Sequence, residues 1–292
     1  MTDRIARYLL AAPAILWLVV LMVVPCVLLL VNSFFERGVY GGIDYVPTAE
    51  NYVRAIDPLF LNVLLTSARI AATAAAIAVI IAYPVAYAIH LTAPAAQARL
   101  LFLVMLPFWS NYLVRTYAWM VMLNPSGIIN NTLAGLGLPT LPLLYNEFAV
   151  VVGLVYNYSP FVVMTVFASL GRVNREVLEA SEDLGASTFD TFRRVLLPLT
   201  VPGIATGFVF VFVLSIGNFV TPALLGGKRV QTVGTLIYDQ FLSARDWPFG
   251  SALATLLIAI MMILLFLQAM VSRRVETGEE KAGLRTVVPG HA

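Results

Sequence analysis

Six long apolar stretches alternate with polar connections along the chain. They cover approximately residues 8–31, 61–91, 100–123, 148–170, 203–225 and 250–271. Each is as long as, or longer than, the ~20 residues that a helix needs to cross the hydrocarbon core of a bilayer. Two of them contain one arginine each, and none contains an aspartate or a glutamate. The pattern predicts an all-α membrane protein, a single domain over residues 1–292 with six transmembrane helices.

The composition supports a membrane location. The chain is 60% hydrophobic and 12% charged, whereas soluble domains are about 45–50% apolar and about 25% charged. Its 18 Lys and Arg against 16 Asp and Glu are too balanced for a nucleic-acid binder, which must neutralise phosphates. One cysteine and two histidines exclude a disulfide framework and leave almost no ligands for a metal site.

The distribution of positive charge predicts the orientation. If the N-terminus is cytoplasmic, eleven Lys and Arg fall in the inner connections and termini, and five fall in the outer connections. Because cytoplasmic loops carry an excess of Lys and Arg, both termini are expected in the cytoplasm, including a C-terminal tail at 272–292.

The inner connection at 171–202 is much longer than the other inner connection and rich in acidic residues. It reads as two short helices around Gly185, a residue that tolerates the left-handed conformation at a helix end. Asn174 and Ser187 are N-cap candidates, and Pro198 is expected to end the second helix. From the residues alone, a solvated amphipathic connector and a docking segment are equally good interpretations.

This connection resembles the signature loop of ABC importer permeases. That signature reads Glu-Ala-Ala, three residues, Gly, nine residues, Ile, one residue, Leu-Pro. The chain has Glu179-Ala180-Ser181, then Gly185, Val195 and Leu197-Pro198 at the same spacing. The resemblance implies a type I ABC importer transmembrane domain in which the 174–198 loop forms a coupling helix against an ATP-binding subunit. The implied coupling residues are Glu179, Ala180, Ser181, Asp183 and Gly185.

Two further stretches, 106–119 and 219–227, are similar to the first of the two permeases of spermidine/putrescine importers. This resemblance implies a bacterial inner-membrane subunit that works with a second homologous permease, two ATP-binding subunits and a periplasmic substrate-binding protein. The two lysines, Lys228 and Lys281, lie outside any Gly-x-x-x-x-Gly-Lys-Ser/Thr motif. The chain is therefore expected to be no enzyme and to bind no cofactor, with ATP and Mg on the partner ATPase. Membrane lipid is an expected partner, and nucleic acid is not.

Transport sites are built from the few polar groups that membrane spans contain. The third, fourth and fifth stretches bring such groups to a similar depth. The third stretch also carries aromatic side chains at helical spacing. Aromatic side chains in a membrane helix more often pack against neighbouring helices than line a pathway. Packing and pathway lining therefore both stay open as interpretations. The pathway candidates are Trp109, Asn111, Tyr112, Arg115, Trp119, Tyr156, Asn157, Asn218 and Thr221. Three acidic residues, Glu147, Asp239 and Asp246, are candidates for gathering cations at the outer mouth.

The substrate stays open at this point. A polycation favours carboxylates or aromatic faces, yet the spans contain no acidic residue, and Arg115 would repel it. Asn218 also stands where polyamine permeases often carry an acidic residue. A polyamine or related small amine and an amino acid or amino-carboxylate are both possible. An ion-coupled secondary transporter is disfavoured because no span holds a carboxylate, and an intramembrane enzyme because the catalytic motifs are missing.

Overall fold

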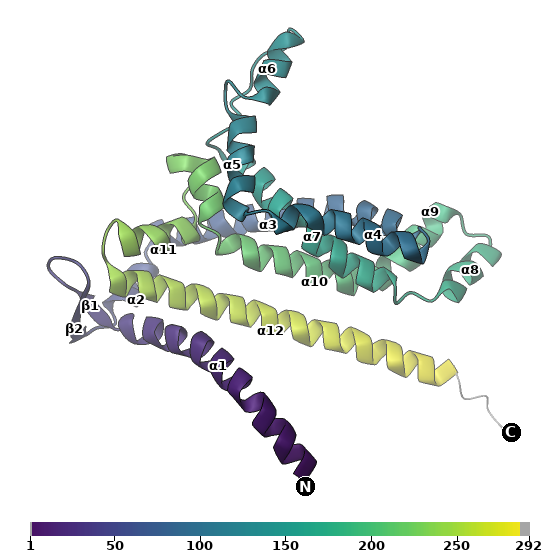
Figure 1. Cartoon of the computed structure of the whole chain (residues 1–292), viewed down its shortest axis with the longest axis horizontal. Helices are drawn as coiled ribbons and strands as arrows, with labels where there is room; N and C mark the ends of the chain where they lie inside the picture. The colour runs from purple at the N-terminus through teal and green to yellow at the C-terminus, as the bar shows by residue number, and fades with distance from the viewer. Residues whose placement is uncertain (1, 287–292) are drawn as a thin grey trace. The chain divides into compact units, whose positions relative to one another are not determined.

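The structure is a computed structural model that describes the backbone of residues 2–286 and the side chains of residues 12, 13, 15–174 and 176–270. It is mostly helical (Figure 1). The label η marks 3-10 and π turns. The elements are α1 (Thr2–Asn32), β1 (Phe35–Arg37), β2 (Ile43–Pro47), α2 (Glu50–Ala55), α3 (Pro58–His90), α4 (Pro94–Met105), η1 (Leu106–Trp109), α5 (Tyr112–Leu123), α6 (Ile128–Gly135), α7 (Glu147–Leu170), α8 (Arg175–Asp183), α9 (Thr188–Thr191), η2 (Phe192–Leu196), α10 (Leu197–Ile216), η3 (Pro222–Gly226), η4 (Gly227–Arg229), α11 (Val233–Leu242) and α12 (Trp247–Thr286).

Five helices within the described residues are long and apolar enough to cross a bilayer. They are Ile15–Asn32, Pro58–His90, Glu147–Leu170, Thr188–Ile216 and Trp247–Met270. The all-α membrane architecture expected from the sequence is confirmed. The chain divides into two compact units, one ending at Leu64 and completed by Val233–Ile260, the other comprising Leu65–Thr232 and the chain from Met261.

The third apolar stretch, expected as one helix over 100–123, is interrupted. α4 ends at Met105, the 3-10 turn η1 follows, and α5 begins only at Tyr112. Pro107 lacks a backbone N–H, and its ring disfavours continuation of the preceding helix. Asn111 then caps α5, because its Oδ1 accepts the Leu113 N–H at 2.8 Å. The two shorter helices therefore enclose a polar break.

A second interruption lies after α10. This helix runs over Leu197–Ile216, whereas the sequence indicated an apolar stretch over 203–225. Asn218 holds the turn that follows, because its Oδ1 accepts the Thr221 N–H at 2.9 Å. The π turn η3 then occupies Pro222–Gly226. Asn111 and Asn218 thus lie at the interruptions between helical segments rather than in the middle of a helix.

The core of the larger unit is built where α3, α7 and α10 pack together. The buried face of α3 consists mostly of alanines, among them Ala74, Ala75 and Ala78, which are completely inaccessible. On α10, a Cβ added to Gly203 would overlap the Ser169 side chain of α7. Small residues allow helix backbones to approach closely where lipid provides no hydrophobic driving force. α7 and α10 accordingly lie alongside one another in Figure 1.

The connection at 171–202, predicted to be cytoplasmic, contains the two short helices that the sequence predicts. Gly185 adopts φ +84° between them. Asn174 Oδ1 accepts the Glu176 N–H at 3.1 Å, and Ser187 Oγ accepts the Asp190 N–H at 3.2 Å. The expectation that Pro198 ends the second helix is wrong. The π turn η2 leads directly into α10, so that Pro198 lies within a continuous helical segment, directly after the π turn. Prolines and π turns are both common irregularities inside long helices.

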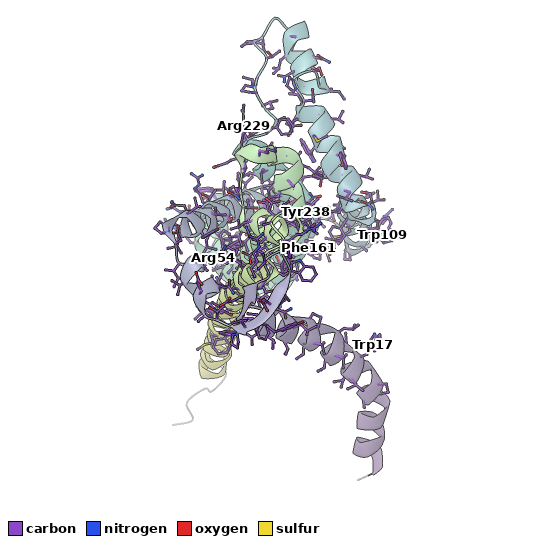
Figure 2. All side chains as sticks on the ribbon, turned by 90° about the vertical axis from the view of Figure 1, so that its left-hand side faces the viewer. Trp17, Arg54, Trp109, Phe161, Arg229 and Tyr238 are labelled. Atoms are coloured by element: carbon purple, nitrogen blue, oxygen red, sulfur yellow. The ribbon has the colours of Figure 1, made fainter. Side chains whose placement is uncertain are left out.

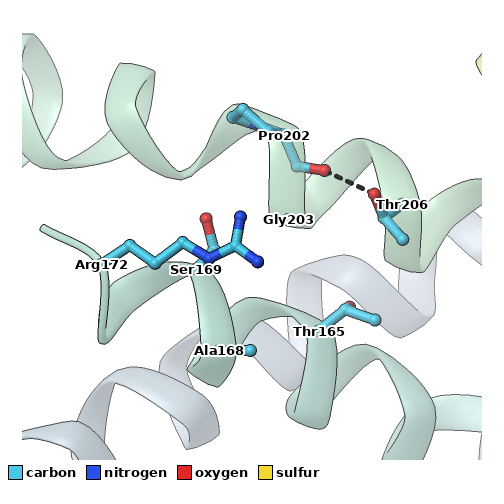
Figure 3. Close-up of a pocket in the computed structure, with 7 residues that line it drawn as sticks. All are labelled: Thr165, Ala168, Ser169, Arg172, Pro202, Gly203 and Thr206. Atoms are coloured by element: carbon cyan, nitrogen blue, oxygen red, sulfur yellow. Dashed lines mark hydrogen bonds between the residues drawn. The ribbon is translucent and has the colours of Figure 1, made fainter. Parts of the chain in front are cut away.

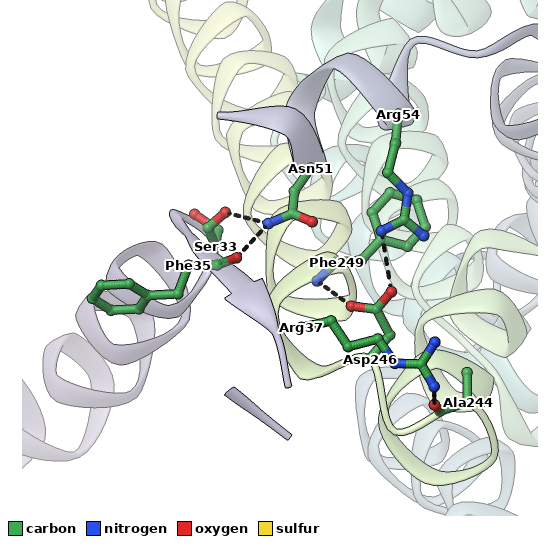
Figure 4. Close-up of polar contacts among 8 residues, drawn as sticks. All are labelled: Ser33, Phe35, Arg37, Asn51, Arg54, Ala244, Asp246 and Phe249. Carbon is green, nitrogen blue, oxygen red and sulfur yellow. Dashed lines mark hydrogen bonds and ion pairs between the residues drawn. The ribbon is translucent and has the colours of Figure 1, made fainter. Parts of the chain in front are cut away.

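In the smaller unit, an unexpected hairpin, β1 paired antiparallel with β2, occupies part of the connection after α1. Arg37 of β1 donates to the Ala244 carbonyl at 2.7 Å (Figure 4). The Asn51 side chain donates to the carbonyls of Ser33 and Phe35 at 3.0 and 2.9 Å. These hydrogen bonds connect α2 to the residues that directly follow α1. The connection is therefore an ordered structure rather than an open loop.

Candidate functional site

Four polar side chains from three segments form a hydrogen-bonded cluster at the two helix interruptions. The Asn218 amide donates to the Tyr112 hydroxyl at 2.6 Å and to the Tyr158 hydroxyl at 2.7 Å. Tyr112 is also hydrogen-bonded to the Thr221 hydroxyl. Tyr112 begins α5, Tyr158 lies on α7, and the other two follow α10. We call these four residues the polar layer. It joins three of the candidates predicted from the sequence.

Two aromatic candidates pack together next to this region of α5 and α7. Trp119 and Tyr156 meet edge to face, with ring centroids 5.5 Å apart. Trp109 lies elsewhere: it is 76% exposed and touches Phe102 (Figure 2). The side chain of Asn111 is used as the cap of α5. Trp109 and Asn111 therefore lie outside the polar layer.

Arg115 is buried, with 7% of its surface exposed. Its guanidinium carbon lies 5.1 Å from the Phe108 ring centroid and 5.8 Å from the Tyr112 ring centroid. Nε has no hydrogen-bond partner within the described part of the chain. Aromatic faces stabilise a cation electrostatically, so two of the rings that could contact a substrate cation already contact a cation of the protein.

Asn157 on α7 is completely buried, and neither its amide nitrogen nor its oxygen has a partner among the described residues. The buried hydroxyl of Ser215 on α10 likewise has none there. The packing of α7 on α10 pairs Ser169 with Gly203 and Thr165 with Gly207. The same antiparallel register continued by two turns brings position 157 opposite position 215, close in sequence to the polar layer.

The three acidic outer-mouth candidates have different surroundings. Glu147 forms an ion pair with Arg69 at 2.5 Å. The carboxylate of Asp246 is buried, pairs with Arg54 at 3.1 Å and accepts the Phe249 N–H at the start of α12 (Figure 4). This arrangement gives Asp246 a structural role, in place of the exposed position that gathering cations requires. Asp239 is exposed on α11.

The coupling residues predicted from the sequence form the exposed tip of the 171–202 connection. Glu179, Ala180, Asp183 and Gly185 are exposed, while Ser181 is half-buried. The Ser181 hydroxyl lies 2.8 Å from the Thr191 hydroxyl, which fastens α8 to α9. The loop therefore presents acidic side chains on a braced helix.

Two apolar side chains extend this exposed face. Leu184 is 88% exposed and Phe189 is 68% exposed, on either side of Gly185. Phe192, three residues further along the chain, turns inward instead and packs against Tyr83, with 5.8 Å between ring centroids. Exposed apolar residues beside acids are typical of a docking surface.

Two pockets lie near the cytoplasmic ends of the helices. One, of about 210 Å³, lies between α8 and the end of α3 and is lined partly by Glu179, Glu182 and His90. The other, of about 240 Å³, lies between α7 and α10 (Figure 3). Hydroxyls of Thr165 and Thr206 and the Arg172 side chain line it. Both pockets thus combine polar groups with apolar walls.

The comparisons with known proteins agree with this architecture. Residues 98–277 match the family described as the binding-protein-dependent transport system inner membrane component, which is more than half of the chain. The chain belongs to this family. It is therefore a multi-pass inner-membrane transport permease rather than an enzyme, and the family expected from the loop is confirmed.

Relatives and solved structures support the assignment. This permease is 38% identical over 266 residues to the spermidine/putrescine transport system permease protein PotB of Haemophilus influenzae, covering 89% of this chain and 93% of that protein. It is 33% identical over 114 residues to PotC, a permease protein of the same kind of system in Escherichia coli, covering 39% of this chain and 43% of PotC. The crystal structure of a bacterial alginate ABC transporter shares the fold, with a TM-score of 0.77, 17% identity and coverage of 94% and 96%. The type I ABC importer fold is confirmed.

The sequence reasoning missed Tyr158 and the exposed pair Leu184 and Phe189. Tyr158 directly follows two predicted candidates, Tyr156 and Asn157. Only the rotation of α7 decides which of these three consecutive residues reaches Asn218. A signal for Leu184 was available, because a leucine directly before a helix-ending glycine in a polar loop has no local apolar partner.

Proposed function

We propose that this permease forms one half of the translocation pathway of an ATP-driven importer of polyamines or related small amines. The observation that carries the proposal is the polar layer, which gathers three hydroxyls and one amide where two helices are interrupted. Hydroxyl and amide oxygens accept hydrogen bonds from ammonium groups. Interrupted helices near a polar cluster are a common way to build a transport site in a membrane.

We also propose the partners and the orientation. PotB and PotC relatives, both named as spermidine/putrescine permeases, support pairing with a second homologous permease. A periplasmic binding protein would deliver the substrate, in agreement with the family description. ATP and Mg would bind to two ATPase subunits, since this chain lacks a phosphate-binding loop. Both termini would be cytoplasmic, following the distribution of Lys and Arg.

The coupling role rests on the tip of the cytoplasmic loop. Glu179 and Asp183 are exposed one helical turn apart, beside the exposed Leu184 and Phe189. Acidic and apolar groups together suit a groove with a basic rim on an ATPase subunit. Movement of this tip would pass directly into α10, because α9, η2 and α10 are continuous.

A second candidate function is import of an amino acid or amino-carboxylate. The buried Arg115 favours it, because a guanidinium with an unpartnered Nε can bind a carboxylate. The relatives favour the amine. Both candidates share the same architecture and partners and differ only in the charge of the substrate.

The experiment is uptake by the complete transporter in proteoliposomes, with radiolabelled spermidine, putrescine and an amino-carboxylate of similar length. ATP-dependent uptake of the amines is expected, and uptake of the amino-carboxylate alone would refute the amine assignment.

In the same assay, Glu179→Ala is expected to lower uptake at least about tenfold while amine binding to the delivery protein is unchanged. Glu50→Gln, an exposed acid outside the loop, serves as the control. Equal uptake by parent and Glu179→Ala would contradict the coupling role.

A further inference from the structure

Arg115 carries a permanent positive charge beside the polar layer. Arginine keeps its proton at any physiological pH. The guanidinium carbon is 5.8 Å from the ring of Tyr112, whose hydroxyl accepts the Asn218 amide at 2.6 Å. Within the residues that the structure describes, Arg115 forms no ion pair with a carboxylate. The contacts of its guanidinium among these residues are with two aromatic rings, which carry no net charge, so its positive charge is not neutralised there.

Burial strengthens the electrostatic interactions of this charge. Arg115 is 7% exposed and lies on α5, about one turn after Tyr112. Charges screened by water and salt act weakly at a distance, whereas buried charges act strongly. A second cation that enters the polar layer therefore meets repulsion that grows with its own charge.

The aromatic contacts of Arg115 have a further consequence. Phe108, 5.1 Å below the guanidinium, also packs edge to face against Phe161, with centroids 4.9 Å apart. The cation–π sites of Phe108 and Tyr112 are occupied by the protein itself. The hydroxyl and amide oxygens of the polar layer remain as acceptors for an incoming ammonium group.

We infer that Arg115 is a specificity-determining residue that keeps multiply charged amines weakly bound in the pathway. A transport site must bind its substrate strongly enough to admit it and weakly enough to release it. The polar layer supplies the attraction, and Arg115 supplies a repulsion that scales with substrate charge. This inference rests on the proposed function, because it concerns amine substrates at the same site.

The test measures equilibrium binding of butylamine, putrescine and spermidine to the complex of both permeases and the ATPase subunits in nanodiscs, without the binding protein. These amines carry one, two and three positive charges. Arg115→Met removes the charge but keeps a long flexible side chain, and it is expected to tighten binding by about fivefold for each substrate charge. Arg115→Lys keeps the charge and is expected to bind like the parent. In uptake assays, Arg115→Met should slow release of spermidine most and butylamine least.

Arg69→Met is the matched control. Arg69 is exposed on α3 and ion-paired with Glu147. Its removal is expected to leave the binding of all three amines within about twofold of the parent, because its charge is already balanced and screened by solvent.

Each other result overturns the inference. If Arg115→Met and Arg115→Lys weaken all three amines equally, Arg115 serves packing only. If Arg115→Met instead abolishes binding of an amino-carboxylate, the guanidinium is an anion subsite. A gain of affinity cannot arise from misfolding, so failure to fold is not confused with the expected outcome. A parent complex that neither binds nor transports any amine would refute the proposed function itself.

Discussion

Asn157 is a buried polar residue whose surroundings packing does not explain. Its amide is completely buried in α7 with both polar atoms unpartnered among the described residues. A buried polar group without a hydrogen bond costs about 1–3 kcal/mol. Because Asn157 directly precedes Tyr158 of the polar layer, we expect this cost to reflect a functional requirement, such as a hydrogen bond formed in another state of the transport cycle.

The residue-scale prediction is that Asn157→Leu leaves stability unchanged or raises it, while uptake falls at least about fivefold. Leucine has a similar size and removes the unsatisfied amide. The control is Asn130→Leu, because Asn130 is equally buried but donates to the Leu141 carbonyl at 3.0 Å and accepts the Leu141 N–H at 2.8 Å. Thermal unfolding in detergent should show a lower midpoint only for Asn130→Leu. A similar loss for Asn157→Leu would mean that its amide is paired.

At the scale of elements, close packing of α7 on α10 connects the cytoplasmic loop to the polar layer. Gly203 and Gly207 allow this approach, because a Cβ at either position would overlap side chains of α7. The loop continues without a break into α10, and α10 ends at the turn that Asn218 holds. α9, η2 and α10 thus form one continuous helical segment between the loop and the polar layer.

The element-scale prediction concerns this contact. Gly203→Ala is expected to lower the unfolding midpoint by several degrees and to reduce uptake, because overpacking costs about 1–3 kcal/mol. Gly217→Ala is the matched control at the other end of α10, where an added Cβ meets nothing within 4 Å. The midpoint of Gly217→Ala should stay close to that of the parent. Equal midpoints for both variants would show that α7 and α10 separate easily.

At the scale of the whole molecule, the placement of charge predicts the orientation in the membrane. Eleven Lys and Arg fall on the predicted inner side and five on the outer side. The exposed tip of the loop, around Leu184, falls on the predicted inner side, and the connection between α6 and α7, around Leu138, falls on the predicted outer side. Orientation by positive charge and docking on a cytoplasmic ATPase therefore require the same topology.

The corresponding prediction uses thiol labelling in whole cells. Cys26 is the only cysteine, so Cys26→Ala provides a cysteine-free background. A membrane-impermeant maleimide is expected to label Leu138→Cys from outside, and to label Leu184→Cys only after the cells are opened. Uptake by each variant serves as the check that the protein is folded. Labelling of Leu184→Cys in intact cells would invert the topology and remove the coupling role.

The features that the sequence predicted correctly depend on local interactions. Helix caps at Asn174 and Ser187 and the left-handed Gly185 involve residues within one turn of each other, and the long apolar spans follow from composition alone. The spacing of the loop motif also identified the family. These properties could be derived without tertiary structure because each is determined by residues that are neighbours in the chain.

The features that only the tertiary structure decided involve residues distant in the chain. Asn218 meets Tyr158 and Tyr112 across 60 and 106 residues, and this meeting depends on the rotation of α7. Asp246 pairs with Arg54, 192 residues away, and so becomes buried. Burial and pairing of a polar group depend on how helices pack, and hydrophobic patterning does not specify which long-range partner a side chain meets.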